Sequence, residues 1–245
     1  MKHAWRRWCL LAVATCLSAL PTEAGDRALI NLIGYSSDLR YLALEEYGEL
    51  DGIGVAYSRI SIVDLTTGDF AAGSPFYKEA DETVQQPLSE MRAATAQAAK
   101  AALSALDVTR PAQVLALSGD GVIGPAAEMR FGLPAYGEPA ATQGEYTLSL
   151  DTFGLPKTQA CDAKLGQAPQ GFALSLAGDG PTRELHRDSA LPEWRGCPVG
   201  YRLYAVVTAH EGDGLSDGAV LVSAYPFDFE GPSRRFLVVP IGEAE

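Results

Sequence analysis

The chain has 245 residues and a formal net charge of −12. An acidic chain without a basic run repels phosphate backbones and anionic lipid, so nucleic acid and the membrane surface are excluded as expected partners. The length suffices to bury a sizeable hydrophobic core.

The first 24 residues have the pattern of a secretory signal peptide. Residues 1–7 are basic, residues 8–20 form an apolar run too short to span a bilayer, and Ala24 is a small residue before the expected cut. Lipidation of Cys16 is an alternative, although Thr15 stands where a lipobox has Gly or Ala. We expect residues 25–245 to form a single, mainly β domain, periplasmic or secreted, without stable membrane insertion.

The strongest local signal lies in residues 34–70. Polar and apolar side chains alternate there with period 2, which is typical of strands with one buried face. Tight turns fit residues 36–39 and 65–68, where Gly68 is free to take a positive φ. The pattern predicts four consecutive antiparallel strands at about 28–35, 40–47, 58–64 and 69–76.

This opening resembles one blade of the propeller repeats of secreted TolB-like proteins. Residues 35–44 (YSSDLRYLAL) and 60–68 (ISIVDLTTG) carry the likeness, with Ser37 and Leu39 in place of Pro and Gly. The sequence has no second copy, whereas a propeller repeats about 40 residues several times. We therefore expect a mainly β (α+β) fold of antiparallel sheets, arranged as a sandwich or a partial propeller.

One long Ala-rich helix is predicted over residues 83–106. Residues 83–86 fit a capping box, and Pro87 is acceptable in a first turn. The small side chains favour close packing on a sheet. Further strands are predicted at residues 113–117, 145–153, 172–176, 201–208 and 219–225. Asp-Gly pairs after residues 113–117 and 172–176 predict two hairpins with positive φ at both turn positions.

Two cysteines remain after residue 24, Cys161 and Cys197. An even pair in an exported chain predicts a disulfide. A reactive or metal-binding pair is the alternative, although neither residue stands in a C-x-x-C motif.

Short motifs spread over the chain resemble the proteobacterial predicted secreted proteins grouped as domain of unknown function 2259. The motifs are GDRA at 25–28, GYS at 34–36, EEYG at 45–48, FGLP at 131–134, HRD at 186–188, RGCP at 195–198 and FEGPSRRF at 229–236. The resemblance implies an exported protein and assigns no activity.

Nucleophile-elbow, Walker A and dinucleotide-binding motifs are missing from the sequence. The sequence predicts no cofactor, but imidazoles near carboxylates offer candidate ligands for a metal ion. The candidates are His186, Asp188, His210 and Glu211. A satisfied strand histidine and a solvated loop are the structural alternatives.

Two further groups of charged residues stand out. Asp228 and Glu230 could act as acid and base in a hydrolase, or could pair with Arg234 and Arg235. Glu45 and Glu46 point to opposite faces of one strand, and the inward one must be paired or lie in a pocket.

Three hypotheses follow. The preferred one is a non-enzymatic periplasmic module that binds or supports an unknown envelope component. The alternatives are a periplasmic metal-binding accessory protein and an envelope hydrolase.

Overall fold

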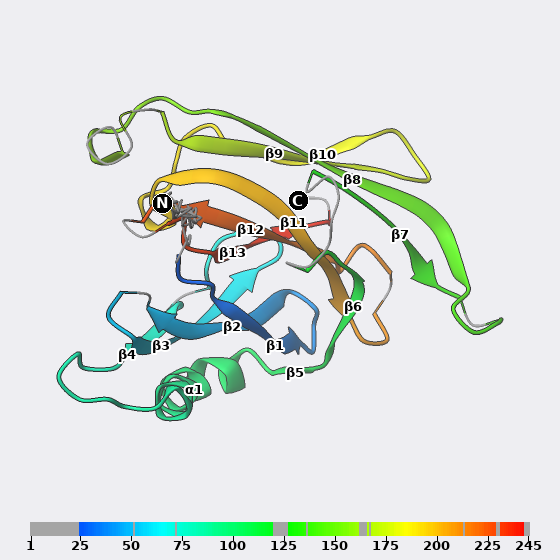
Figure 1. Ribbon diagram of the computed structural model, residues 1–245. Coiled ribbons are helices and arrows are strands. Elements are labelled where there is room, and N and C mark those ends of the chain that lie inside the picture. Colours follow the sequence, from blue (N-terminus) through cyan, green and yellow to red (C-terminus); the bar gives the residue numbers. More distant parts are fainter. Residues whose placement is uncertain are drawn as a thin grey trace, which may run out of the picture.

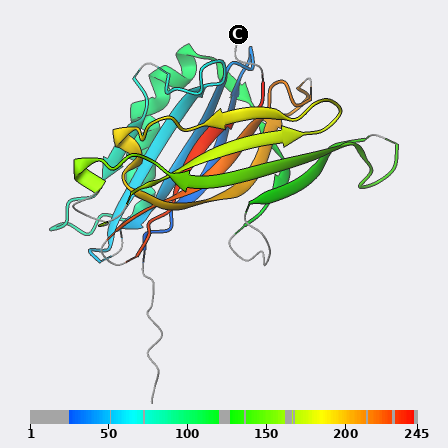
Figure 2. The ribbon, with the colours of Figure 1, turned by 90° about the horizontal axis from the view of Figure 1, so that it is seen from above.

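The computed structural model describes residues 25–50, 52–71, 73–119, 127–135, 137–161, 166, 168–212, 214–228 and 231–242. Their strands form three antiparallel sheets stacked as layers, with one long helix outside the stack (Figure 1). We call the layers the N-terminal, middle and outer sheets. Seen from above, the outer-sheet strands cross those of the other two sheets at an angle (Figure 2). The predicted mainly β fold of antiparallel sheets is confirmed.

The N-terminal sheet has the order β4-β3-β2-β1-β5. Its strands are β1 (Leu29–Ser36), β2 (Tyr41–Leu50), β3 (Val55–Asp64), β4 (Phe76–Glu79) and β5 (Val108–Arg110). Four consecutive antiparallel strands are present, but only the first three match the predicted ranges. The predicted fourth strand at 69–76 is wrong, because it shares only Phe76 with β4 and Phe70 forms an isolated bridge with Val63. Gly68 has φ +76°, as its turn requires, and Leu39 takes φ +63° where the blade signature has Gly.

Helix α1 (Leu88–Ala105) packs on β3 and β4. The predicted start at residue 83 is wrong. Asp81 Oδ1 accepts hydrogen bonds from the backbone N–H and the hydroxyl of Thr83, which closes a separate turn there. Pro87 then forms the N-cap, because the residue before a proline avoids the helical region. Within the described residues, no helix has the length and apolarity to cross a membrane.

The middle sheet has the order β13-β12-β11-β6 and apolar neighbours on both faces. Its strands are β6 (Ala112–Leu117), β11 (Pro198–Ala209), β12 (Ala219–Pro226) and β13 (Arg235–Pro240). Side chains such as Val207 and Leu221 pack on Leu44 of the N-terminal sheet. Their strand neighbours, such as Val206 and Val220, face the outer sheet. This double burial explains why β12 is almost continuously apolar.

The outer sheet has the order β10-β9-β8-β7. Its strands are β7 (Glu128–Pro134), β8 (Thr142–Gly154), β9 (Gln170–Ala177) and β10 (Arg183–Arg187). The side chains of Leu148, Phe172 and Leu174 are almost completely buried against the middle sheet. A short 3-10 helix, η1 (Glu193–Arg195), connects β10 to β11.

One of the two predicted Asp-Gly hairpins is present. β9 pairs with β10, but five residues join them, and neither Asp179 nor Gly180 has a positive φ. A two-residue turn was therefore the wrong prediction. The turn of the other predicted hairpin, at Asp120 and Gly121, lies outside the described residues; among those described, β6 pairs with β11, and the following described strand, β7, belongs to the outer sheet.

Candidate functional site

A cleft of about 760 Å³ lies where the three sheets meet. One wall is β13 of the middle sheet, and another is the β10–η1 segment of the outer sheet. The third is the turn after β3, residues 65–70. The polar and aromatic lining residues used below are Thr66, Thr67, Asp69, Phe70, Arg183, Glu184, His186, Arg187, Asp188, Ser189, Trp194 and Arg195. A volume of this size lies within the usual range of small-molecule sites, about 300–1,000 Å³.

Asp188 is the best-connected polar residue of the cleft. Nη1 of Arg195 lies 2.8 and 2.7 Å from its two carboxylate oxygens, and Nε2 of His186 lies 3.0 Å from Oδ1. The backbone N–H of Phe172 donates to Oδ2 at 2.9 Å. The His186 ring also stacks on Phe172, with ring centroids 4.6 Å apart. His186 is thus held from two sides while 31% of its side chain remains exposed.

These contacts determine the charge state of Asp188. Burial raises the pKa of the carboxyl, but the hydrogen bonds from His186, Arg195 and Phe172 outweigh this effect and lower the pKa below its ordinary value. Asp188 is therefore a carboxylate whose charge is balanced by the buried Arg195 guanidinium. Burial in turn raises the pKa of the nearby Tyr201 hydroxyl to about 12, so it stays neutral.

Two aromatic rings from different layers meet at the cleft. Trp194 of η1 and Phe70 after β3 have ring centroids 5.2 Å apart and planes inclined by 60°. The guanidinium carbon of Arg195 lies 5.6 Å from the centre of the Trp194 ring. Trp194 is held by these contacts and still exposes 50% of its surface. A fixed and half-open indole offers an apolar face with a polar N–H edge.

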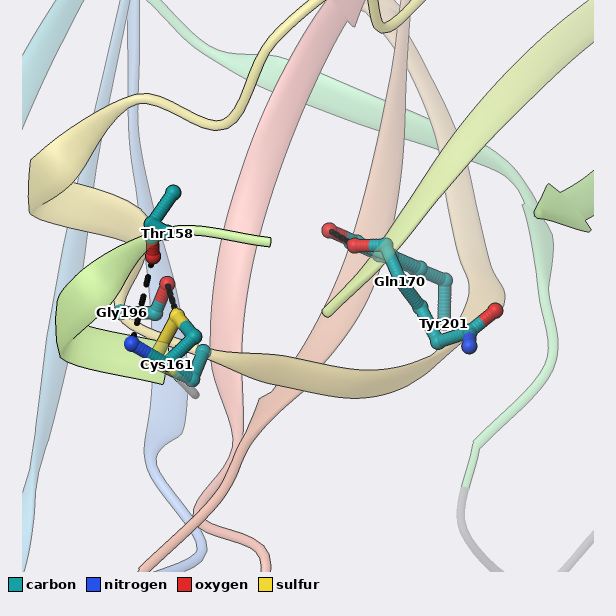
Figure 3. The surroundings of a disulfide bond; sticks show 6 residues. Thr158, Cys161, Gln170, Gly196 and Tyr201 are labelled. Atoms are coloured by element: carbon teal, nitrogen blue, oxygen red, sulfur yellow. Dashed lines mark hydrogen bonds between the residues drawn. A yellow bond between two sulfur atoms is a disulfide. The ribbon is translucent and has the colours of Figure 1, made fainter. Parts of the chain in front are cut away.

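The predicted disulfide is present and anchors the segment that carries Trp194 and Arg195. Cys161 and Cys197 have Cα atoms 5.5 Å apart, and Cys197 follows η1 by two residues. The backbone N–H of Cys161 donates to Thr158 Oγ1, and nearby the Tyr201 hydroxyl donates to the Gln170 carbonyl at 3.0 Å (Figure 3). The disulfide therefore ties η1 to the chain that follows β8.

The structure buries both Glu45 and Glu46, on opposite faces of β2. Glu45 lies on the helix side, where Arg92 of α1 donates two hydrogen bonds of 2.9 and 2.7 Å to it and Ser58 donates a third. Burial raises the pKa of Glu45, but the bonds from Arg92 and Ser58 bring it below its ordinary value. This carboxylate joins α1 to the N-terminal sheet.

Glu46 faces the middle sheet and accepts a hydrogen bond from the Phe236 backbone N–H. Burial is the largest influence and raises its pKa, against the opposing effects of Arg59, this N–H and Arg235. Arg235 forms an ion pair with Asp26, with Nη1 2.7 Å from Oδ2, although the geometry falls short of a hydrogen bond. Sequence reasoning missed Asp26 and Arg59 as members of this buried cluster.

The other candidate residues lie apart from the cleft. His210 and Glu211 form an exposed turn after β11, so they belong to the middle sheet while His186 and Asp188 belong to the outer one. Arg234 donates to the Ala28 carbonyl. Asp228 accepts a hydrogen bond from Ser233, and Glu230 lies outside the described residues.

The described part of the chain contains no group of three or more His, Cys, Asp or Glu side chains arranged to hold a metal ion. The four metal candidates are accordingly not brought together. Among the candidates that the structure describes, only His186 and Asp188 line the cleft. His186 lies on β10 and Asp188 directly follows that strand, and their separation by two residues in extended chain was the sequence signal for a shared face. Trp194, Arg195 and Phe70 carried no such signal.

Comparison with protein families gives one match. The sequence pattern of the family described as "Predicted secreted protein (DUF2259)" matches residues 43–242. The chain belongs to this family. The match confirms the resemblance seen in the short motifs and the description as a secreted protein, while the proteobacterial origin and the likeness to a TolB-type blade stay predictions. No curated protein and no solved structure matches the chain.

Proposed function

We propose that this DUF2259 protein is an exported, non-enzymatic binding module of the cell envelope, and that the cleft between its three sheets takes a small polar ligand. Residues 1–24 act as its signal peptide, and the periplasm is its compartment. The observation that carries the proposal is the cleft itself, to which all three sheets contribute side chains. A site assembled from three layers is rigid, which lowers the entropy cost of binding.

The pairing of the cleft residues favours binding over catalysis. A histidine that acts as a base needs an orienting carboxylate that can stabilise its positive charge. Asp188 already accepts two contacts from Arg195, which neutralises that carboxylate. Glu184 and Arg187 also form an ion pair, with Nη2 2.7 Å from Oε2. Groups held in this way are suited to fix a ligand by hydrogen bonds.

Trp194 provides a direct test. The chain has three tryptophans, and the other two, Trp5 and Trp8, lie within residues 1–24. Once the signal peptide is removed, tryptophan fluorescence, excited where the ten tyrosines of the chain absorb little, reports on Trp194 alone. The low-molecular-mass fraction of a periplasmic extract should change this fluorescence in a saturable manner.

Ala190→Phe places a bulky ring on the cleft wall, and Ala101→Phe is the matched control on the exposed face of α1. The first substitution should abolish the response and the second should preserve it. No response in the unaltered protein, or an equal response in the Ala190→Phe variant, would overturn the proposal.

A further inference from the structure

The formal charges around the cleft cancel. The lining contains three arginines, Arg183, Arg187 and Arg195, and three carboxylates, Asp69, Glu184 and Asp188. Arg195 is paired with Asp188, Arg187 with Glu184, and the guanidinium of Arg183 donates to the Ile241 carbonyl at 2.9 Å. A strongly anionic ligand needs an excess of positive potential, and this site within an acidic protein lacks it. The balance points to a ligand without net charge.

The edges of the cleft are unsuited to an added peptide strand. β13 is an edge strand, and the Ile241 N–H just beyond it donates to Gly218 on the side of β12. By alternation, Phe236, Val238 and Pro240 direct their backbone groups outward. Pro240 has no N–H, and Glu46 already accepts the N–H of Phe236. At most one of these three positions can donate to an added strand.

β10, the other edge strand at the cleft, is also protected. It has only five residues, and a bulge interrupts its pairing between Glu184 and His186. Short, bulged and charged edges are a common means of preventing strand addition. An extended peptide therefore has no continuous backbone template on either edge.

What the cleft offers is an aromatic plane beside neutral hydrogen-bonding groups. Trp194 is fixed by Phe70 and Arg195 and is half exposed. The side chains of Thr66, Thr67 and Ser189 line the same cleft and are exposed. A pyranose ring has one face of C–H groups, which packs on an aromatic ring, and a rim of hydroxyl groups that donate and accept hydrogen bonds.

We propose that the cleft binds a neutral oligosaccharide, with one sugar ring stacked on Trp194. The inference rests on the proposed function, since it names the ligand class of the same cleft. His186 and the hydroxyl side chains supply hydrogen bonds to the sugar rim, and the paired arginines keep the walls in place.

The test uses residues 25–245 and three neutral hexasaccharides: cellohexaose, maltohexaose and the hexamer of N-acetylglucosamine. At least one should bind in calorimetry and shift the Trp194 fluorescence. Because the ligand is neutral, affinity should change little between about 0.05 and 0.5 M salt. A hexamer of uronic acid should bind more weakly than its neutral counterpart.

Substitutions at Trp194 test whether the sugar binds on the indole ring. Trp194→Ala should weaken calorimetric binding about tenfold or more, while Trp194→Phe should recover most of it, because a planar ring remains. Phe227→Ala is the matched control, since Phe227 is an exposed aromatic residue outside the cleft lining. It should leave the affinity unchanged, and urea unfolding of each variant verifies that the fold is intact.

The outcomes separate the two proposals. Binding of the periplasmic extract without binding of any neutral hexasaccharide overturns the saccharide assignment and leaves the binding module standing. Binding of the uronic acid hexamer in place of the neutral sugars overturns it as well. Sugar binding that persists unchanged in Trp194→Ala overturns the placement. Failure of both the extract and the sugars overturns the proposed function itself.

Discussion

Oε1 of Glu46 accepts a hydrogen bond of 2.7 Å from the backbone N–H of Phe236, 190 residues later in the chain. The bond joins β2 of the N-terminal sheet to the edge strand of the middle sheet. The carboxyl group is almost completely buried, and burial raises its pKa. Two layers of the fold are therefore linked by a group whose charge depends on pH.

Glu46 should make the protein less stable as the pH rises. Because the folded-state pKa is raised, the native state keeps a proton that the unfolded chain releases. The stabilisation of the folded state by this retained proton is fully present below the unfolded pKa, about 4.3, and is lost as the pH rises through the folded pKa. Glu46→Gln keeps an acceptor oxygen and has no proton to release. Its free energy of unfolding, relative to the unaltered protein, should therefore increase in urea titrations as the pH rises above the unfolded pKa.

Glu90→Gln is the control for this measurement, because Glu90 is exposed on α1. The difference in free energy of unfolding between Glu90→Gln and the unaltered protein should stay constant with pH. A difference in free energy of unfolding between Glu46→Gln and the unaltered protein that falls or stays constant with rising pH would contradict the prediction.

Asp188→Asn should destabilise the fold by about 3–5 kcal/mol, since it leaves the buried Arg195 guanidinium without its counter-charge. Both side chains are less than a tenth exposed. The lowered pKa of Asp188 means that its contribution is present above the unfolded pKa, about 3.9, and disappears as the pH falls through the folded value. Urea unfolding at pH 7 measures the loss. Asp69→Asn, an exposed carboxylate of the same cleft, should change stability by less than about 0.5 kcal/mol.

Replacing both Cys161 and Cys197 by Ser should lower the free energy of unfolding by about 3–4 kcal/mol, because the bond closes a long loop in the unfolded chain. The two cysteines are 36 residues apart in sequence. Since Cys197 follows η1, the Trp194 fluorescence should also move to longer wavelength. Reductant should reproduce both changes in the unaltered protein and have no effect on the double variant. Equal stability with and without the bond would refute this.

Glu45 and Arg92 should be energetically coupled. A double-mutant cycle with Glu45→Gln and Arg92→Met should give a coupling of about 1–2 kcal/mol, moderated by solvent because the Arg92 side chain is 37% exposed. The exposed pair Glu184 and Arg187 provides the comparison. Its coupling should be much weaker, because both partners are exposed to solvent. Similar values for the two pairs would mean that burial of Glu45 contributes little.

A strand could be predicted from the sequence where the pattern of side chains within a single short segment is enough to define it. The alternation in residues 40–47 and 58–64 predicted β2 and β3, because period 2 is a local property. The same alternation suggested that only one of Glu45 and Glu46 is buried. Both are buried because α1 covers one face of the sheet and the middle sheet covers the other, and no local pattern records such an arrangement.

The cleft depends on contacts between distant segments, which is why its main residues escaped prediction. His186 and Asp188 could be paired from their spacing. Arg195 reaches Asp188 only because η1 folds back on the outer sheet, and Phe70 meets Trp194 only because the sheets stack. The sequence shows that residue 194 is a tryptophan, but it does not show which residues contact the ring.

The middle sheet also governs the order in which the chain can fold during export. The strands β1 to β4, α1 and β5 lie within residues 29–110 and can pair as they emerge. β6, however, waits for β11, which begins at Pro198. Until then the apolar side chains of Tyr35, Leu42 and Leu44 have no cover. The nascent protein therefore carries an exposed apolar surface through most of its translocation, a period in which it depends on chaperone protection or rapid delivery of its last three strands.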